Sequence, residues 1–273
     1  MALVTGASRG IGAAYARALA ARGYDLVLVS RDHERLEQLA TELRALVKVS
    51  ILVMDLSEPD AGHRLYAAVT GQGLSVDLLV HNAGFGSYGP FVELPMPTIQ
   101  QMHRLHLATV LESTRLFLPQ MVDRGTGGVI VVSSIAGFFS VPYLAKYAAS
   151  KAFLLQFYRA LAEELRPSGV TVQVCCPGTT STDFHSTAGF RSQHPLGSQD
   201  PARVVAVSLA ALGRRRTVVT IGWRGALLLL LSRWVPPSWT ARGAACWMRP
   251  SAGSPGTARL HGESDAETER DRT

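Results

Sequence analysis

The chain of 273 residues is 47% hydrophobic and carries 27 Lys and Arg against 21 Asp and Glu, a formal net charge of +6. This length and apolar content suit one large α/β domain or two small ones, with a substantial core. No aromatic residues interleave with the arginines as they would in a nucleic-acid site, so we expect no nucleic-acid partner, whereas a basic body attracts small anionic ligands.

The first residues bear on the compartment, and the cysteines and histidines bear on metal binding. Met1 is followed at once by the apolar run ALVTG, without a basic stretch or a long apolar stretch, so we expect no secretory signal and a cytoplasmic protein. The three cysteines have neither disulfide nor zinc-site spacing, and His103 and His106 have no evident third partner for a metal. We therefore expect no bound metal.

Short β-branched runs alternate with longer amphipathic stretches along the chain. Stretches such as HERLEQLATELRAL at 33–46 and IQQMHRLHLATVLESTRLFLPQM at 99–121 have the three-to-four spacing of helices. Strands that are apolar throughout and separated by helices predict a parallel sheet covered on both faces, the doubly wound α/β or Rossmann fold. The predicted strands are Ala2–Thr5, Leu26–Ser30, Val47–Met54, Asp77–His81, Val129–Ser133, Val170–Cys175 and Val218–Ile221.

No linker or repeat divides the chain before about residue 250, so we predict a single domain over 1–249 and, because 250–273 is polar and rich in small residues, a disordered tail. The helical segment 223–249 contains WRGALLLLLSRWVPPSW, an apolar stretch far shorter than the roughly 20 residues that span a bilayer. We expect either a helix that buries its leucines against the domain or over a substrate cleft, or a surface helix in the lipid interface with Arg224 and Arg233 at its edges.

The first predicted strand leads directly into VTGASRGIG, where Gly6, Gly10 and Gly12 are spaced G-x-x-x-G-x-G. Glycines let the backbone turn tightly and approach a pyrophosphate, whose charge the free N–H groups and the dipole of the following helix favour. We therefore predict a dinucleotide site at this junction.

The end of the second predicted strand indicates which dinucleotide binds. A site for NAD usually has an acid here for the ribose 2′-hydroxyl, but this chain has Ser30 and Arg31 after LVLV. Arg31, together with Arg9 of the glycine loop, can bind a 2′-phosphate through charge-assisted hydrogen bonds. The sequence thus predicts NADP(H).

Several motifs together resemble the short-chain dehydrogenase/reductase family over roughly residues 1–249. In chain order they are TGASRGIG at 5–12, the Asp55–Leu56 pair, HNAG at 81–84, VVSS at 131–134, the Tyr147/Lys151 pair and PGTTST at 177–182. Within the family, FGSYGPF at 85–91, VPYLAKYAASKAFLLQF at 141–157 and the leucine-rich segment most resemble the bacterial DltE-like group of reductases.

The resemblance implies roles for the matching residues. Tyr147 would be the catalytic acid/base, Lys151 its neighbour and the ligand of the nicotinamide ribose, and Ser134 the donor that holds the substrate oxygen. The resemblance also implies a homodimer or homotetramer through the helices at 97–123 and 143–166. The other implied cofactor contacts are Gly6, Ser8, Arg9, Gly10, Ile11 and Gly12 in the first loop, Asp55 and Leu56 at the adenine, Asn82, Ala83 and Gly84 beside the central strand, and Pro177, Gly178, Thr180 and Thr182 over the nicotinamide.

Tyr147 and Lys151 stand four residues apart, so both side chains project from one face of a helix. A phenol with a pKa near 10 must fall by about 3 units to exchange protons near neutrality, which costs roughly 4 kcal/mol. One ammonium about 5 Å away supplies on the order of 3 kcal/mol at an effective dielectric constant of about 20. We therefore expect Lys151 to supply most of the lowering of the Tyr147 pKa, and the positive nicotinamide ring of the oxidised cofactor to supply the rest. The expected reaction is hydride transfer between NADP(H) and the carbonyl or secondary alcohol of a hydrophobic substrate.

One position departs from the family's pattern. His106 in LHLATVLEST stands where the family usually has an asparagine that holds a proton-relay water and a local helix distortion. Histidine donates and accepts hydrogen bonds, so it either keeps a relay or simply packs in the helix. The main alternative to an enzyme is an NADP(H)-binding sensor or scaffold without turnover, which His106 favours and the intact Ser134, Tyr147 and Lys151 oppose.

Overall fold

A computed structural model of the chain describes residues 1–181, 198–222 and 236–248. The predictions for Thr182, for most of the leucine-rich segment and for the tail at 250–273 lie outside these residues. In the part of the chain that the structure describes, no helix is both long and apolar enough to cross a membrane.

The centre of the protein is one seven-stranded sheet with the order β3-β2-β1-β4-β5-β6-β7, and each neighbouring pair of strands is parallel. The predicted doubly wound sheet is therefore confirmed, with the ends of several strands shifted by one or two residues. The strands are β1 (Ala2–Thr5), β2 (Leu26–Ser30), β3 (Val49–Val53), β4 (Leu78–His81), β5 (Gly127–Val132), β6 (Val170–Cys176) and β7 (Val218–Thr220).

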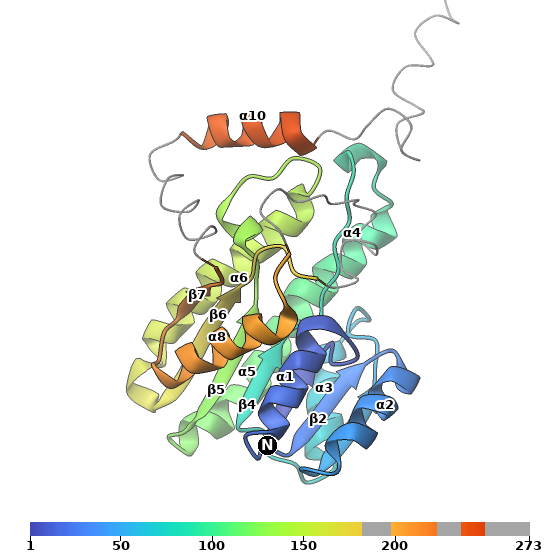
Figure 1. Cartoon of the computed structure of the whole chain (residues 1–273), viewed down its shortest axis with the longest axis vertical. Helices are drawn as coiled ribbons and strands as arrows, with labels where there is room; N and C mark the ends of the chain where they lie inside the picture. The colour runs from blue at the N-terminus through green and yellow to red at the C-terminus, as the bar shows by residue number, and fades with distance from the viewer. Residues whose placement is uncertain (182–197, 223–235, 249–273) are drawn as a thin grey trace, which may run out of the picture.

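Helices cover both faces of the sheet (Figure 1). One apolar core lies under α1 (Gly10–Ala20), α2 (His33–Leu43) and α8 (Pro201–Gly213), and the other under α3 (Ala61–Thr70), α5 (Thr109–Asp123) and α6 (Ala145–Glu164). Neighbouring residues of a strand point into opposite cores, as Leu3 and Val4 of β1 do. This burial on both faces explains why the strands are apolar throughout.

The long helix predicted from 99 to 121 is interrupted. The structure has α4 (Met96–His103), then a π-helical turn over Arg104–Ala108, then α5. A π-helical turn widens the helix locally and often marks a functional site. It contains His106, whose side chain is buried.

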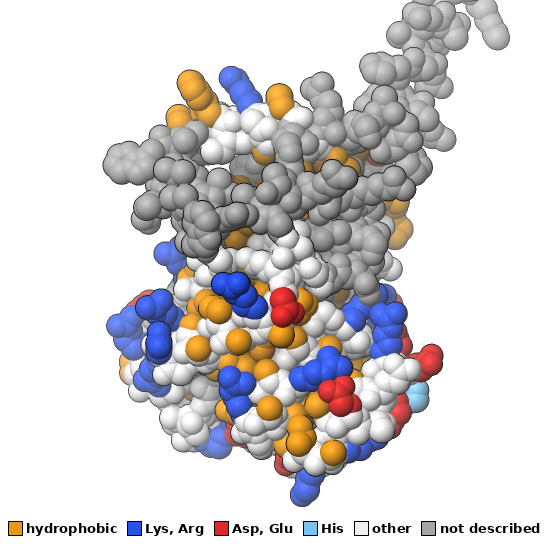
Figure 2. Space-filling model, in the orientation of Figure 1, with side chains coloured by type: hydrophobic (Ala, Val, Ile, Leu, Met, Phe, Trp, Pro, Cys, Tyr) orange, Lys and Arg blue, Asp and Glu red, His pale blue; other side chains and the backbone are white. Residues whose placement is uncertain are grey.

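The carboxyl ends of the parallel strands meet at one end of the sheet, which faces upward in Figure 1. Helix α10 (Pro237–Met248) lies across this end, and the Tyr88 hydroxyl donates a hydrogen bond to the carbonyl of Met248 there. Basic side chains outnumber acidic ones on the face shown in Figure 2, in keeping with the net charge of +6. The loops that carry the predicted functional residues leave the sheet at its carboxyl end.

Candidate active site

The glycine loop connects β1 to α1 in a conformation that requires glycine. Gly6 has a φ of +65°, and a Cβ added at Gly12 would lie 2.1 Å from the carbonyl oxygen of Gly6. The first turn of α1 carries no acidic side chain. A tight turn against a helix N-terminus without negative charge fits the pyrophosphate of a dinucleotide, as the sequence predicts.

Asn82 fastens this loop to the end of β4. Its side-chain amide donates to the carbonyl oxygens of Thr5 at 3.0 Å and Gly6 at 3.2 Å. In return, the Thr5 hydroxyl accepts hydrogen bonds from the backbone N–H groups of Asn82 at 2.9 Å and Ala83 at 3.1 Å. The implied support by Asn82 thus consists of direct bonds between the ends of two adjacent strands.

Arg31 lies at the end of β2 with its guanidinium beside Asp55, at 3.3 Å between Nη1 and Oδ2. Burial acts to raise the pKa of Asp55, but hydrogen bonds from the hydroxyl and backbone N–H of Ser57, and then the charge of Arg31, hold it below its ordinary value. The carboxylate therefore stays charged and orients Arg31 at the edge of the predicted ribose site.

The acid that follows Arg31 in the sequence has a different task. Asp32 is the N-cap of α2, and its Oδ1 accepts from the backbone N–H of Arg35 at 3.1 Å. Its Oδ2 lies 3.4 Å from Nε of the same arginine. Because this carboxylate is used within α2, the end of β2 presents a cation rather than an acid, which fits a 2′-phosphate.

The loop after β3 is held by the π-helical turn and its neighbours. The Thr109 hydroxyl donates to the carbonyl of Leu56 at 2.8 Å, and Nε of Arg104 donates to the carbonyl of Ser57 at 2.7 Å. Hydrogen bonds thus join the loop after β3, which is predicted to border the adenine, to the π-helical turn that contains His106 and to the start of α5. Sequence reasoning did not find Ser57, Arg104 or Thr109, because their partners lie on distant segments.

Tyr147 and Ser134 meet beside the carboxyl end of β5. Tyr147 lies in the first turns of α6, and Ser134 caps a short 3₁₀ turn over Ile135–Phe138, accepting from the N–H of Ala136 at 3.1 Å. Burial raises the pKa of Tyr147 to about 12, although a hydrogen bond with Ser134 acts to lower it. The two hydroxyls implied to bind one substrate oxygen are therefore already in contact.

Lys151 approaches the same site from one turn further along α6. Its Nζ lies 5.7 Å from the centre of the Tyr147 ring and donates to the carbonyl of Val132 at 2.8 Å. Burial lowers the pKa of Lys151 to about 8. In the cofactor-free protein the expected lowering of the Tyr147 pKa by Lys151 is not found, because the desolvation of the phenol raises that pKa; the further lowering expected from the oxidised nicotinamide stays a prediction.

The 3₁₀ turn also holds the backbone of α6 in place. A Cβ added at Gly137 would lie 2.8 Å from the carbonyl carbon of Lys151, and the Ser133 hydroxyl donates to the carbonyl of Lys151 at 2.8 Å. Such close contact requires a glycine in the turn. The end of β5 and α6 therefore form one packed unit around the Tyr147/Lys151 pair.

The loop at 177–181 borders the site on the β6 side. The carbonyl of Pro177 accepts from the N–H of Ile135 at 3.0 Å, and the Thr180 hydroxyl donates to the carbonyl of Gly178 at 3.1 Å. The structure thus brings Pro177 and Gly178 next to the turn that begins at Ser134, while Thr180 is bonded within the same loop.

His106 projects from the π-helical turn toward Tyr147. The two rings meet edge to face, with 6.1 Å between their centres. Nε2 of His106 accepts from the backbone N–H of Phe85 at 3.1 Å, and Nδ1 lies 2.9 Å from Oγ of Ser150. The local helix distortion implied by the family resemblance is present, and it carries a histidine.

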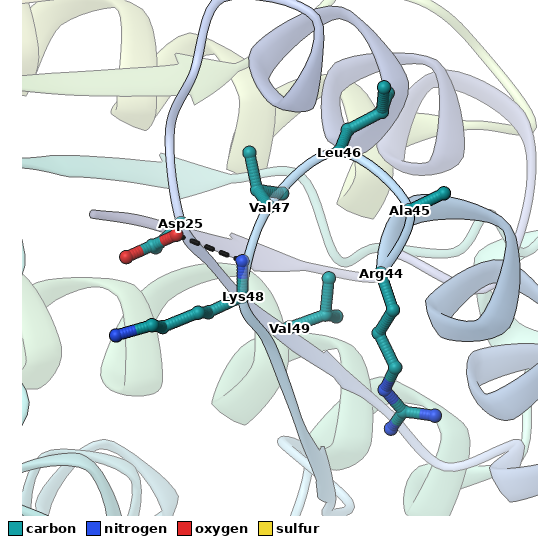
Figure 3. A pocket seen from close by; sticks show the side chains of 7 residues that line it. All are labelled: Asp25, Arg44, Ala45, Leu46, Val47, Lys48 and Val49. Atoms are coloured by element: carbon teal, nitrogen blue, oxygen red, sulfur yellow. Dashed lines mark hydrogen bonds between the residues drawn. The ribbon is translucent and has the colours of Figure 1, made fainter.

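A separate depression lies at the other end of the sheet (Figure 3). Its residues stand before β2 and at the start of β3, the amino ends of these strands, and Asp25 accepts there from the backbone N–H of Lys48 at 2.9 Å. It is therefore not part of the site around Tyr147. It is lined by Asp25, Arg44, Ala45, Leu46, Val47, Lys48 and Val49.

Comparison with known proteins shows which family the chain resembles. A family model for short chain dehydrogenases matches residues 1–191. A very-long-chain 3-oxoacyl-CoA reductase of Phaeosphaeria nodorum is 34% identical over 220 residues, which are 78% of this chain and 63% of that protein. The chain thus spans less than two thirds of the length of this relative.

Solved structures extend the likeness to three dimensions. A short-chain dehydrogenase from Sphingobium yanoikuyae in complex with NADPH is 31% identical, with a TM-score of 0.78 over 93% of this chain and 98% of that one. The bulky-bulky ketone specific alcohol dehydrogenase from Comamonas testosteroni is 29% identical, with a TM-score of 0.72 over 85% of this chain and 91% of that one.

Proposed function

Since this chain belongs to the short-chain dehydrogenase family, we propose that it is an oxidoreductase that uses NADPH to reduce the carbonyl group of a bulky hydrophobic substrate. The contact between Ser134 and Tyr147, with Lys151 on the same helix face, carries the proposal. This cluster lies at the carboxyl ends of the strands, where ligands bind in open α/β sheets.

The residues present fit NADP(H). Gly6 and Gly12 leave room for close backbone approach to the pyrophosphate, Arg31 stands where the 2′-phosphate is expected, and Asn82 holds the loop between them and the Tyr147 cluster. Bound NADPH supplies a hydride to the carbonyl carbon of the substrate. The solved relative that holds NADPH supports the same cofactor.

The chain's own residues handle the oxygen and the proton. Ser134 donates a hydrogen bond to the carbonyl oxygen and orients it toward the Tyr147 hydroxyl. Tyr147 then gives its proton to the oxygen as negative charge develops there. A phenol whose pKa is raised to about 12 is fully protonated beforehand, which suits a proton donor in the direction of reduction. The positive charge of Lys151 stabilises the phenolate that remains.

The substrate class we propose is a 3-oxoacyl thioester with a long acyl chain. The relative from Phaeosphaeria nodorum is named for this chemistry, and the ketone-specific neighbour from Comamonas testosteroni is named for bulky ketones. Both names describe a carbonyl flanked by large groups. Phe91, Val92 and Trp239, which are 58%, 82% and 68% exposed, add apolar surface on the segments after β4 and on α10.

The subgroup of the family, the location in the cell and the oligomeric state are also proposals. The resemblance to the DltE-like group, the cytoplasmic location and the homodimer or homotetramer rest on the sequence alone, and the relative from Phaeosphaeria nodorum is named a 3-oxoacyl-CoA reductase, not a DltE-like protein. The sensor without turnover is an outcome of the experiment below.

The test is NADPH oxidation by the purified protein, followed by absorbance, with 3-oxoacyl thioesters of increasing chain length, bulky ketones and aldehydes. We expect turnover with the longer thioesters, and its loss in Tyr147→Phe while the NADPH Kd stays the same, because the phenol oxygen holds the proton but not the phosphates. Turnover retained in Tyr147→Phe would contradict the acid role. NADPH binding without turnover on any substrate would favour the sensor.

A further inference from the structure

We propose that His106 is a positioning residue for Tyr147: its imidazole joins the loop after β4 to helix α6 through two hydrogen bonds, and it carries no proton in the reaction. The inference rests on the proposed function for its kinetic part and on the contacts of His106 for its structural part. It decides between the proton relay and the simple packing role that the sequence leaves open.

The hydrogen-bond partners set the tautomer of the ring. The backbone N–H of Phe85 can only donate, so Nε2 of His106 must be the acceptor in the 3.1 Å bond between them. A neutral ring then carries its proton on Nδ1 and donates it to Oγ of Ser150, 2.9 Å away. The Ser150 hydroxyl donates in turn to the carbonyl of Tyr147 at 2.7 Å. The chain of bonds runs in one direction, from the Phe85 amide to the Tyr147 carbonyl.

The surroundings keep the ring neutral. His106 is 1% exposed and Ser150 is 4% exposed. Burial, followed by the positive charges of Lys151 and Lys146, holds the pKa of His106 well below its usual value. A second proton, on Nε2, would require breaking the bond to Phe85, since both ring nitrogens are engaged. The ring therefore has no nitrogen with which to exchange a proton with the substrate or with Tyr147.

The imidazole of His106 is closely surrounded by the loop after β4 and by α6. A Cβ added at Gly84 would lie 3.0 Å from Nε2 of His106, so the glycine lets the imidazole reach the loop. The ring faces Phe85 at 5.9 Å and Tyr147 at 6.1 Å between centres, edge to face in both cases. The π-helical turn at Arg104–Ala108 places His106 between them. One side chain thus connects the cofactor side of the site with the helix that carries Tyr147.

Two substitutions of His106 keep one hydrogen bond each, and two further substitutions break the link between Phe85 and Tyr147. His106→Asn places an amide where Nδ1 stands and keeps a donor for Ser150, while His106→Gln places one where Nε2 stands and keeps an acceptor for Phe85. His106→Phe fills the space without either bond. Ser150→Ala removes the link from the other side. His103→Phe is the matched control, since His103 lies on the same helical path and is exposed.

We expect His106→Phe and Ser150→Ala each to lower kcat on the order of 10- to 100-fold, because a misplacement of a reacting group by about 1 Å costs that much in rate. KM and the NADPH Kd should change little. The double variant should lose no more than either single one, because both break the same link. His106→Asn and His106→Gln should fall between wild type and His106→Phe, and the pH profile of kcat should keep its shape in all of them. If kcat in His106→Phe equals that of the wild type, His106 only fills space in the helix. If the pH profile of kcat changes shape, His106 takes part in a proton relay. Either result overturns the proposal.

An NMR measurement tests the link without any substrate. In protein labelled with ¹⁵N-histidine, the signal that disappears in His106→Phe, or in His106→Gln if the first variant does not fold, belongs to His106. We expect its Nδ1 to be protonated and its Nε2 to be bare, unchanged between about pH 6 and pH 9. A proton on Nε2, or a ring that titrates in this range, would refute the link. If wild type reduces no substrate, the proposed function fails while this measurement still decides the role of His106.

Discussion

Lys151 donates a hydrogen bond from Nζ to the backbone carbonyl of Val132, the last residue of β5, at 2.8 Å. The amine is 5% exposed and its ordinary pKa of 10.5 is lowered by burial to about 8. The lysine is therefore bonded to the sheet below it as well as directed toward Tyr147. Between about pH 8 and 10, Lys151 therefore loses its charge in the folded protein but keeps it in the unfolded chain.

This relationship predicts a rise in stability with pH. Between about pH 8 and 10.5 the unfolded chain keeps the proton on Lys151 while the folded protein releases it, so the unfolded state binds more protons and the free energy of unfolding increases with pH. The full contribution is at most about 3 kcal/mol at 1.36 kcal/mol per pKa unit. Below pH 8 the charged, buried amine destabilises the fold by a constant amount.

Urea unfolding of the cofactor-free protein from pH 7 to 10, beside Lys151→Met, measures this effect. The variant keeps the approximate size of the side chain and has no proton to lose, so the rise in unfolding free energy between about pH 8 and 10 should be present in the wild type and absent in Lys151→Met. Other groups titrate in both proteins and cancel in the difference. Parallel curves for the two proteins would show that Lys151 has an ordinary pKa in the fold.

Arg31→Asp should change the cofactor preference. It replaces the cation at the end of β2 with an acid next to Asp55, which repels a 2′-phosphate and can bind a 2′-hydroxyl. We expect the NADPH Kd to rise by roughly 10- to 100-fold, since a charge-assisted bond is worth about 1.5–3 kcal/mol, and the NADH Kd to stay equal or fall. Arg22→Asp, with the same change of charge just after α1 and far from the glycine loop, should leave both constants unchanged. An unaltered ratio of the two constants in Arg31→Asp would remove Arg31 from the site.

A buried polar cluster under α8 predicts a large loss of stability. The Tyr15 hydroxyl donates to Oγ of Ser208 at 2.6 Å, and this hydroxyl donates to Oε1 of Gln173 at 2.5 Å. All three side chains are 0% exposed. Ser208→Ala takes the donor from Oε1 of Gln173 and one partner from the Tyr15 hydroxyl, which still contacts the Cys175 thiol, at about 1–3 kcal/mol for the unpaired acceptor, whereas Tyr15→Phe removes one donor and should cost about 1 kcal/mol. Urea unfolding measures the free energy of unfolding of both variants. Equal losses would contradict the central position of Ser208 between Tyr15 and Gln173.

The parts of the site that could be predicted from the sequence are those whose chemistry is local. Gly6, Gly10 and Gly12 follow a strand and open a helix, and Tyr147 and Lys151 share a helix face through their spacing alone. The strands were found because burial on both faces leaves a continuous apolar run. Each of these signals is contained in fewer than about 15 neighbouring residues.

The rest depends on contacts between distant segments and on burial. Ser150 meets His106 from 44 positions away, and the bond from Arg104 to Ser57 spans 47. Asp32 follows Arg31 directly, yet only the geometry of α2 shows that its carboxylate caps the helix. The pKa of Tyr147 was expected to fall from its spacing to Lys151, because spacing reports nearness but not the desolvation that raises it.

Gly12→Ala tests the glycine loop directly. The new Cβ would lie 2.1 Å from the carbonyl oxygen of Gly6 and 2.6 Å from Nδ2 of Asn82, and the first of these is backbone that cannot rotate away. The loop must therefore shift, and Asn82 loses its bonds to Thr5 and Gly6. Gly213→Ala is the matched control, because a Cβ there meets nothing within 4 Å, and it should be neutral or slightly stabilising at about 0.4–1 kcal/mol. Calorimetric titration with NADPH should show binding lost in Gly12→Ala and intact in Gly213→Ala. If Gly12→Ala folds and binds NADPH as the wild type does, the loop does not approach the pyrophosphate closely, and the dinucleotide site must lie elsewhere on the carboxyl end of the sheet.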